Sequence, residues 1–255
     1  MSFSLTAVVA FAHGCAEGRH GPGPDAGDAR GDEPPVQVDA GAIFADASPE
    51  PDATGSDRPH EPDASAPADE RLTLTYNSSL EIAPDSDLVC FDEQTLEHRD
   101  NHYFRVFDLA GDFDLPDGFV VESISIGILL AQGSGGSQQA AVRVGHQAAA
   151  ATPDLAEAIL LRERVVSIPD GERMLFEIDD LDARIPAGSA LLVEFFTPSG
   201  VPGANRLYIG GNFADETAPS FLLARDCGID EPLTFGALGF GAHRWVVTVE
   251  GRPAT

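Results

Sequence analysis

The sequence predicts an all-β protein, an antiparallel β-sandwich or jelly roll of about eight or nine strands that follows a disordered acidic spacer. Short apolar or alternating runs recur between residues 101 and 250, and turn-forming stretches such as "QGSGGSQ", "PDGE" and "PSGVPG" separate them. No long helical pattern lies between the runs, which argues against a βαβ fold.

The N-terminus, residues 1–15, is predicted to be a targeting segment. "SLTAVVAFAHGC" is a short apolar run that ends in small residues and then Cys15, and it resembles a bacterial lipoprotein signal with lipidation at that cysteine. The alternative is a plain secretory signal cleaved near Cys15. Because Ala16 follows the cysteine in place of aspartate, we expect the outer membrane as the location of a lipid-anchored form.

Residues 16–70 are predicted to be a disordered spacer. They hold fourteen acidic residues and three arginines, a net charge of −11, and almost no large apolar residue beyond Ile43 and Phe44. Such a segment buries too little apolar surface to offset the entropy lost on ordering its backbone. It would therefore form an extended tether behind the lipid anchor.

The folded domain is expected at residues 71–255. It carries a net charge of −16, so its field disfavours nucleic acids and anionic membrane surfaces, and we expect membrane contact only through the lipid. One helical turn is expected in "PDLAEA", and "GIDEP" is expected to be a loop. The predicted strands are 101–109, 119–131, 140–146, 158–168, 173–178, 189–197, 206–211, 220–224 and 243–250.

The stretch "NHYFRVFDL" concentrates polar side chains in one predicted strand. As a strand it places Tyr103, Arg105, Phe107 and Leu109 on one face, and His102, Phe104, Val106 and Asp108 on the other. Aromatic residues on both faces predict an inner strand that is partly covered on both sides. Arg105 and Asp108 cannot pair directly, so we expect a buried arginine satisfied by a carboxylate from elsewhere.

This stretch resembles the "NSYYRVFDL" signature of an extracellular β-sandwich module found in secreted bacterial peptidases and surface proteins. The signature positions here are Asn101, Tyr103, Arg105, Phe107 and Asp108. The resemblance continues through "GDFDLPDGFVVESISIGI", "PAGSALLVEFFTP" and "TAPSFLLARDCGI", and departs at His102, where the module usually has serine. It implies an accessory, non-catalytic role and lends no catalytic residues.

Two cysteines remain in the domain if Cys15 is lipidated. An even pair in an oxidising compartment predicts a Cys90–Cys227 disulfide. In the chain-entropy view, closing so long a loop contributes at most about 4–5 kcal/mol. The module has cysteines at corresponding places.

Asp112, Asp114 and Asp117 offer three carboxylates within "DFDLPDG". Oxygen-rich loops suit Ca²⁺, but Ser123 stands where an EF-hand has its closing glutamate, so we expect no cofactor, with calcium as the open alternative. A turn that uses Pro116 and Gly118 explains the same residues.

No catalytic motif has the required spacing. The chain has neither a G-x-S-x-G elbow nor an H-E-x-x-H pair, and the lone Trp245 lies in an alternating strand, where we expect core packing. Three hypotheses remain: an envelope-anchored, non-catalytic module that binds an extracellular protein or glycan, a structural or surface-coat protein, and a cryptic hydrolase.

Overall fold

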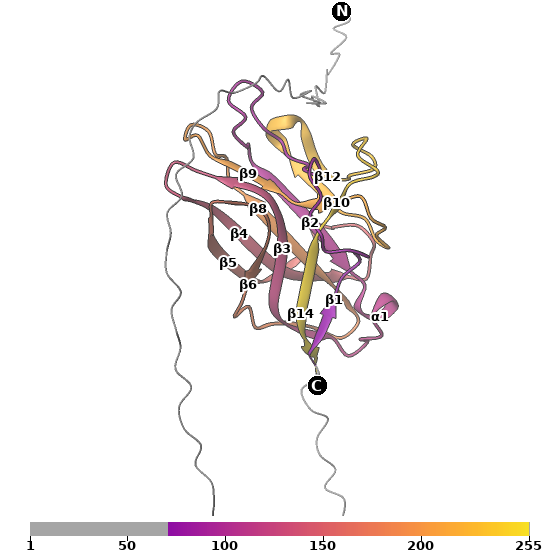
Figure 1. The fold of residues 1–255 in the computed structure, drawn as a ribbon. Coiled ribbons are helices and arrows are strands. Elements are labelled where there is room, and N and C mark those ends of the chain that lie inside the picture. The colour runs from indigo at the N-terminus through magenta and orange to yellow at the C-terminus, as the bar shows by residue number, and fades with distance from the viewer. Residues whose placement is uncertain (1–70, 255) are drawn as a thin grey trace, which may run out of the picture. The chain divides into compact units, whose positions relative to one another are not determined.

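The computed structural model describes residues 71–254, and within them the chain is an all-β, two-sheet antiparallel sandwich (Figure 1). This confirms the predicted fold class. The predicted lipidation site Cys15 and the spacer 16–70 lie outside the described residues.

The first sheet is built on the long strand β3. Strand β14 pairs with the first part of β3 and β9 pairs with its last part. Strands β6 and β7 also pair with β3, and β1 extends the sheet beyond β14. The members are β1 (Leu72–Leu74), β3 (Phe119–Gln132), β6 (Gly171–Ile178), β7 (Ala183–Ile185), β9 (Arg206–Ile209) and β14 (Val247–Pro253).

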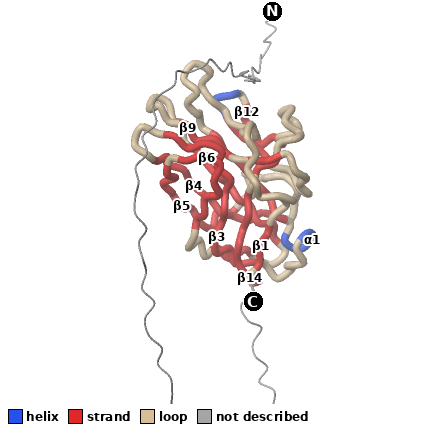
Figure 2. The backbone as a smooth tube through the Cα atoms, viewed as in Figure 1, coloured by secondary structure: helices blue, strands red, loops and turns tan. Residues whose placement is uncertain are grey.

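The second sheet has the order β12-β11-β2-β8-β4-β5, with every neighbouring pair antiparallel. A separate two-stranded ladder joins β10 (Gly211–Asn212) to β13 (Arg244–Trp245). The second-sheet strands are β2 (Asn101–Phe107), β4 (Ser137–Ala148), β5 (Ile159–Pro169), β8 (Ser189–Thr197), β11 (Phe221–Ala224) and β12 (Ile229–Thr234). Figure 2 shows how strands dominate the described backbone.

The core between the sheets is aromatic. Tyr103 of β2 lies 6.4 Å from Phe195 of β8 and 6.1 Å from Trp245, measured between ring centroids, and all three side chains are fully buried. The expectation that Trp245 packs in the core is confirmed. Strand β2 lies between β11 and β8 and is buried on both faces apart from the partly exposed His102, as its aromatic pattern predicted.

Of three further local predictions, two were wrong. The strand at 101–109 ends at Phe107, because Asp108 caps the short helix α1 (Leu109–Asp112) by accepting from the Gly111 amide at 3.0 Å. The "PDLAEA" segment forms the expected single turn, in which the Ala158 amide donates to the Asp154 carbonyl at 2.9 Å. The "GIDEP" segment opens strand β12, whose Pro232 is tolerated because β12 is an edge strand that needs no full set of amide donors.

The predicted strands 206–211 and 243–250 are each split, and the cause is a close approach of three backbones. Gly127 donates to Val246 at 2.8 Å and accepts from Gly210 at 2.7 Å, so the ladder changes partner at this point. A Cβ on Gly127 would lie 2.7 Å from the Gly210 carbonyl oxygen and would clash with it. Only glycine fits at this position.

Candidate functional site

The signature residue Arg105 has a structural role. Its side chain is fully buried, and its guanidinium donates to Glu216 at 2.9 Å, to the Ser220 hydroxyl at 2.6 Å and to the Trp245 carbonyl at 3.0 Å. Burial lowers the pKa of Arg105, and the charge of Glu216 opposes that shift. The predicted buried arginine with a distant carboxylate is therefore confirmed, and this cluster ties β2 to the loop before β11 and to β13 rather than facing a ligand.

The other polar signature residues also hold the chain together. Asn101 accepts from the Cys90 amide at 2.7 Å and donates to the Cys90 carbonyl at 3.1 Å. Cys90 in turn forms the predicted disulfide with Cys227. Asp108 is the helix cap described above, and Tyr103 and Phe107 are core residues.

The three acidic residues proposed for calcium do not gather into a metal site. Asp112 accepts a 2.6 Å hydrogen bond from the Tyr76 hydroxyl, and all three carboxylates lie on exposed residues. Gly118 donates to the Leu115 carbonyl at 3.2 Å, so the segment makes a turn. Between residues 71 and 254, no group of three or more His, Cys, Asp or Glu side chains is placed to hold a metal ion.

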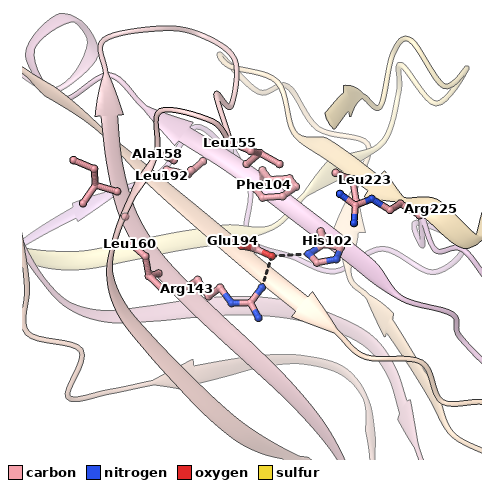
Figure 3. Close-up of a pocket in the computed structure, with 12 residues that line it drawn as sticks. His102, Phe104, Arg143, Leu155, Ala158, Leu160, Leu192, Glu194, Leu223 and Arg225 are labelled. Carbon is pink, nitrogen blue, oxygen red and sulfur yellow. Dashed lines mark hydrogen bonds and ion pairs between the residues drawn. The ribbon is translucent and has the colours of Figure 1, made fainter. Parts of the chain in front are cut away.

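A groove in the outer face of the second sheet is the best candidate for a binding site. Its volume is about 310 Å³, and it is lined from strands β2, β4, β5, β8 and β11 and from the loop before β5 (Figure 3). Its walls are mainly aliphatic. The lining residues are His102, Phe104, Arg143, Gly145, Leu155, Ala158, Ile159, Leu160, Leu192, Glu194, Leu223 and Arg225.

The floor of the groove is a well-packed apolar layer. Phe104, Leu192 and Leu223 are buried members of one cluster, and Ala158 of the preceding loop packs against it. At the rim the apolar side chains are uncovered, since Leu155 is 44% and Leu160 56% exposed. Apolar side chains that are half open to water in a groove are typical of ligand grooves and interaction surfaces.

A chain of charges crosses the groove beside this apolar layer. Glu194 Oε1 lies 2.6 Å from His102 Nδ1 and 2.8 Å from Arg143 Nη1, and Arg143 Nε lies 2.7 Å from Glu163. Figure 3 shows His102 and Arg143 converging on Glu194. The ring of Phe196 supports the pair, since His102 stacks on it at 4.5 Å and the Arg143 guanidinium lies 5.0 Å from its centroid.

The geometry keeps Arg143 charged. Partial burial lowers the pKa of Arg143, but the hydrogen bond to Glu163 and the charge of Glu194 raise it more, so the net shift is upward. Arg143 and Glu194 therefore satisfy one another and give the groove a fixed polar wall.

Arg225 lines the same groove but takes no part in this network. It begins the 3₁₀ turn η1 (Arg225–Cys227), is exposed, and has no ion pair with any carboxylate in residues 71–254. In Figure 3 it lies next to Leu223, on the His102 side of the groove. The groove thus offers an apolar floor and one uncompensated positive charge.

Sequence reasoning did not find this site. It noted His102 as a departure from the module that the sequence resembles, and Arg143, Glu194 and Arg225 were not among its candidate residues. The available signal was a charged residue within an apolar strand, as in "LLVEFF" and "AAVRV", which requires a partner across the sheet.

No protein-family model and no curated protein matches the chain. Among solved structures, it is similar to the chain with the cysteine protease and lectin-like domains of Cwp84, a surface layer associated protein of Clostridium difficile. The identity is 11% and the TM-score 0.43, over 62% of this chain and 33% of that one.

A second similar structure is the clostridial cysteine protease Cwp84 after propeptide cleavage, at 12% identity and a TM-score of 0.48, over 74% of this chain and 42% of that one. The chain thus spans a third to two fifths of the length of these chains. Likeness at this level says nothing about function. No helix in residues 71–254 has the length and hydrophobicity to cross a membrane.

Proposed function

We propose that this chain is an exported envelope protein, lipid-anchored at Cys15 in the outer membrane, whose β-sandwich is a non-catalytic module that binds a protein partner. The ligand is a peptide segment with a large apolar side chain close to a carboxylate. The apolar side chain lies on the floor formed by Phe104, Leu192 and Leu223, and the carboxylate pairs with Arg225.

The single observation that supports a peptide ligand is the composition of the groove. Four of its lining residues are leucines, at 155, 160, 192 and 223; it has no Tyr or Trp, and its one Phe side chain, Phe104, is 1% exposed. Glycan sites depend on exposed aromatic faces and dense hydrogen bonding, whereas an aliphatic slot suits an Ile, Leu or Phe side chain. A protein partner therefore fits this groove better than a glycan.

A hydrolytic role has less support from the same residues. The lining has no Ser, Thr, Cys or Tyr, so no hydroxyl or thiol nucleophile faces His102. Glu194 is the one carboxylate in the lining, and Arg143 and His102 both bind it. A two-carboxylate hydrolytic mechanism has no second acid here.

Selection from a displayed peptide library against the full-length protein tests the proposal, with glycan binding measured in parallel. Enriched peptides are expected to combine Ile, Leu or Phe with a nearby Asp or Glu. Leu160→Asp, at a 56% exposed groove position, should weaken their binding about tenfold, which corresponds to roughly 1.4 kcal/mol of lost apolar contact.

Leu175→Asp is the matched control, because Leu175 is 47% exposed on β6 in the other sheet. It should leave binding unchanged. Enrichment of glycans without peptides, or equal losses in both variants, would show that the groove is not a peptide site.

A further inference from the structure

We propose that the free edge of strand β5 binds an extended segment of another protein as an added antiparallel strand. Two acidic side chains of that segment face Arg162 and Arg164. This surface is separate from the groove and does not depend on the groove being a peptide site, because the groups that bind are main-chain groups at the edge of the sheet.

Strand β5 is a long and exposed edge strand. It is the last strand of the second sheet, and within residues 71–254 it pairs with β4 alone (Figure 1). The strand at the other end of that sheet, β12, contains Pro232, and the edge strand β1 of the first sheet has only three residues. In contrast, β5 has eleven residues, and those from Ile159 to Val165 are all exposed. An exposed edge of this length is a template for pairing with another chain.

The hydrogen bonds between β4 and β5 show which main-chain groups of β5 are already used. The Asp170 amide donates to the Gly136 carbonyl at 3.1 Å, one position beyond the first facing pair of the two strands. Facing pairs in an antiparallel ladder alternate between hydrogen-bonded and non-hydrogen-bonded. The even-numbered residues from Arg162 to Ile168 therefore direct their N–H and C=O groups toward β4.

The odd-numbered residues of the same stretch direct their main-chain groups away from β4. Glu163, Val165 and Ser167 are all exposed, and each offers one donor and one acceptor at the free edge. Pro169, which has no N–H group, occupies an odd position where no donor to β4 is needed. An incoming antiparallel strand can therefore form hydrogen bonds with three alternate residues of β5.

The charged side chains of this edge indicate the chemistry of the partner. Arg162 and Arg164 are two residues apart, so both point to the same face of the sheet. Arg162 donates to the Leu181 carbonyl at 2.6 Å and forms no ion pair with a carboxylate in residues 71–254. Arg164 lies 3.9 Å from Asp180, whose side chain is 85% exposed. Both guanidinium groups can therefore accept a carboxylate from an added strand.

The remaining side chains of the edge complete the pattern. Glu163, between the two arginines, already pairs with Arg143 at 2.7 Å and needs no further partner. On either side of the arginines, Leu161 is 38% and Val165 63% exposed. A matching segment has two acidic residues separated by one residue, with β-branched apolar residues on both sides, since facing side chains across a ladder contact one another.

A second copy of this chain fits the edge less well. A symmetric pair of β5 strands has a two-fold axis at one residue, which then faces its own copy. In the register that uses the whole strand this residue is Arg164, and like charges that face one another across a ladder are destabilising. Each domain also has a net charge of −16, which repels its copy. The occupant is therefore a different protein.

The test titrates the full-length protein with the capped synthetic peptide "SVDTDVS" and follows the exchange of the β5 amides by NMR. Physiological ionic strength screens the acidic field of the domain. Bound peptide should slow exchange at Glu163, Val165 and Ser167 and leave the even-numbered amides, which already bond to β4, unchanged. The same peptide with Asn in place of both Asp residues should bind about fivefold more weakly, because it loses two ion pairs.

Val165→Pro removes one outward amide without changing the hydrogen bonds to β4, and it should weaken peptide binding about tenfold. Val165→Thr is the matched control, because it keeps the amide and the β-branched shape, and it should bind as the wild type does. Arg225→Glu alters the groove, which Val165 does not line, and should leave binding of this peptide unchanged. If Val165→Pro lowers the melting temperature, amide exchange in the wild type decides the question.

Three outcomes would overturn the proposal. The first is no binding at millimolar peptide, or binding that leaves the three odd-numbered amides unprotected. The second is loss of binding in Arg225→Glu, which would place the peptide in the groove and support the proposed function instead. The third is a dimer in sedimentation that Val165→Pro dissociates, since the occupant of the edge would then be a second copy.

Discussion

Replacing the buried Arg105 with methionine is expected to destabilise the domain severely. The substitution keeps much of the side-chain volume but removes the donors to Glu216, Ser220 and the carbonyl of Trp245. Glu216, whose side chain is only 9% exposed, would keep just Arg244 as an ion-pair partner, at 3.8 Å. Its charge would be left largely uncompensated in the interior.

The expected cost follows from that stranded carboxylate. Removing one partner of a buried ion pair costs about 3–5 kcal/mol, because the remaining charge keeps its desolvation penalty. In a domain of this size each kcal/mol lowers the melting temperature by about 2–4 °C, so we expect a decrease of roughly 6–20 °C. Adding Glu216→Gln to Arg105→Met should recover part of the loss, because it removes the unpaired charge.

Urea unfolding followed by circular dichroism measures these free energies, with Arg164→Met as the control. Arg164 is half exposed and lies 3.9 Å from the exposed Asp180, so losing that pair should cost less than about 1 kcal/mol. If Arg105→Met costs no more than Arg164→Met, or if the double variant shows no recovery, the ion-pair account of Arg105 is wrong.

Three further predictions concern stability. Cys90→Ser with Cys227→Ser should lower the free energy of unfolding by up to about 5 kcal/mol, since the bridge closes a loop with a sequence separation of 137 residues; a change below about 1 kcal/mol in urea unfolding would contradict this. The backbone amides of Gly203 and Ala204 lower the pKa of Glu97 from its ordinary 4.5. Burial lowers the pKa of His98 from its ordinary 6.5. Both groups bind protons more readily in the unfolded chain, so the melting temperature should fall as pH drops below about 6.5 through His98, and again below about 4.5 through Glu97. Glu97→Gln should remove the second decrease, and an unchanged profile would refute its assignment. Millimolar Ca²⁺ should leave the melting temperature unchanged, whereas a rise that Asp114→Asn abolishes would restore the calcium hypothesis.

Local patterns in the sequence were enough to predict the class of fold and most long strands. The alternating run of residues 189–197 corresponds to β8 without any shift in its ends, because both its burial and its flanking turns are encoded within a few residues. The cysteine count likewise predicted the disulfide. Where a tertiary contact overrides local preference, as at Pro232 in β12, the prediction was wrong.

The groove could not be predicted in the same way. Its polar wall depends on the register that places Glu194 opposite Phe104 on one side and Arg143 on the other. These residues come from strands far apart in the chain, and a shift of one residue in either pairing would turn them to the opposite face. The sequence alone contains no signal for that register.

The position of the disulfide makes the geometry of the groove rim depend on the redox state of two cysteines. Cys227 ends the same short turn that Arg225 begins, and its partner Cys90 is held by two hydrogen bonds to Asn101 at the start of β2. A covalent bond therefore fixes the cationic rim of the groove to a central strand. Under reducing conditions the two cysteines remain free thiols and the bond does not form. Without the bond, the turn that carries Arg225 would be held to β2 by non-covalent contacts alone, so breaking the disulfide is expected to loosen the groove rim as well as to lower stability.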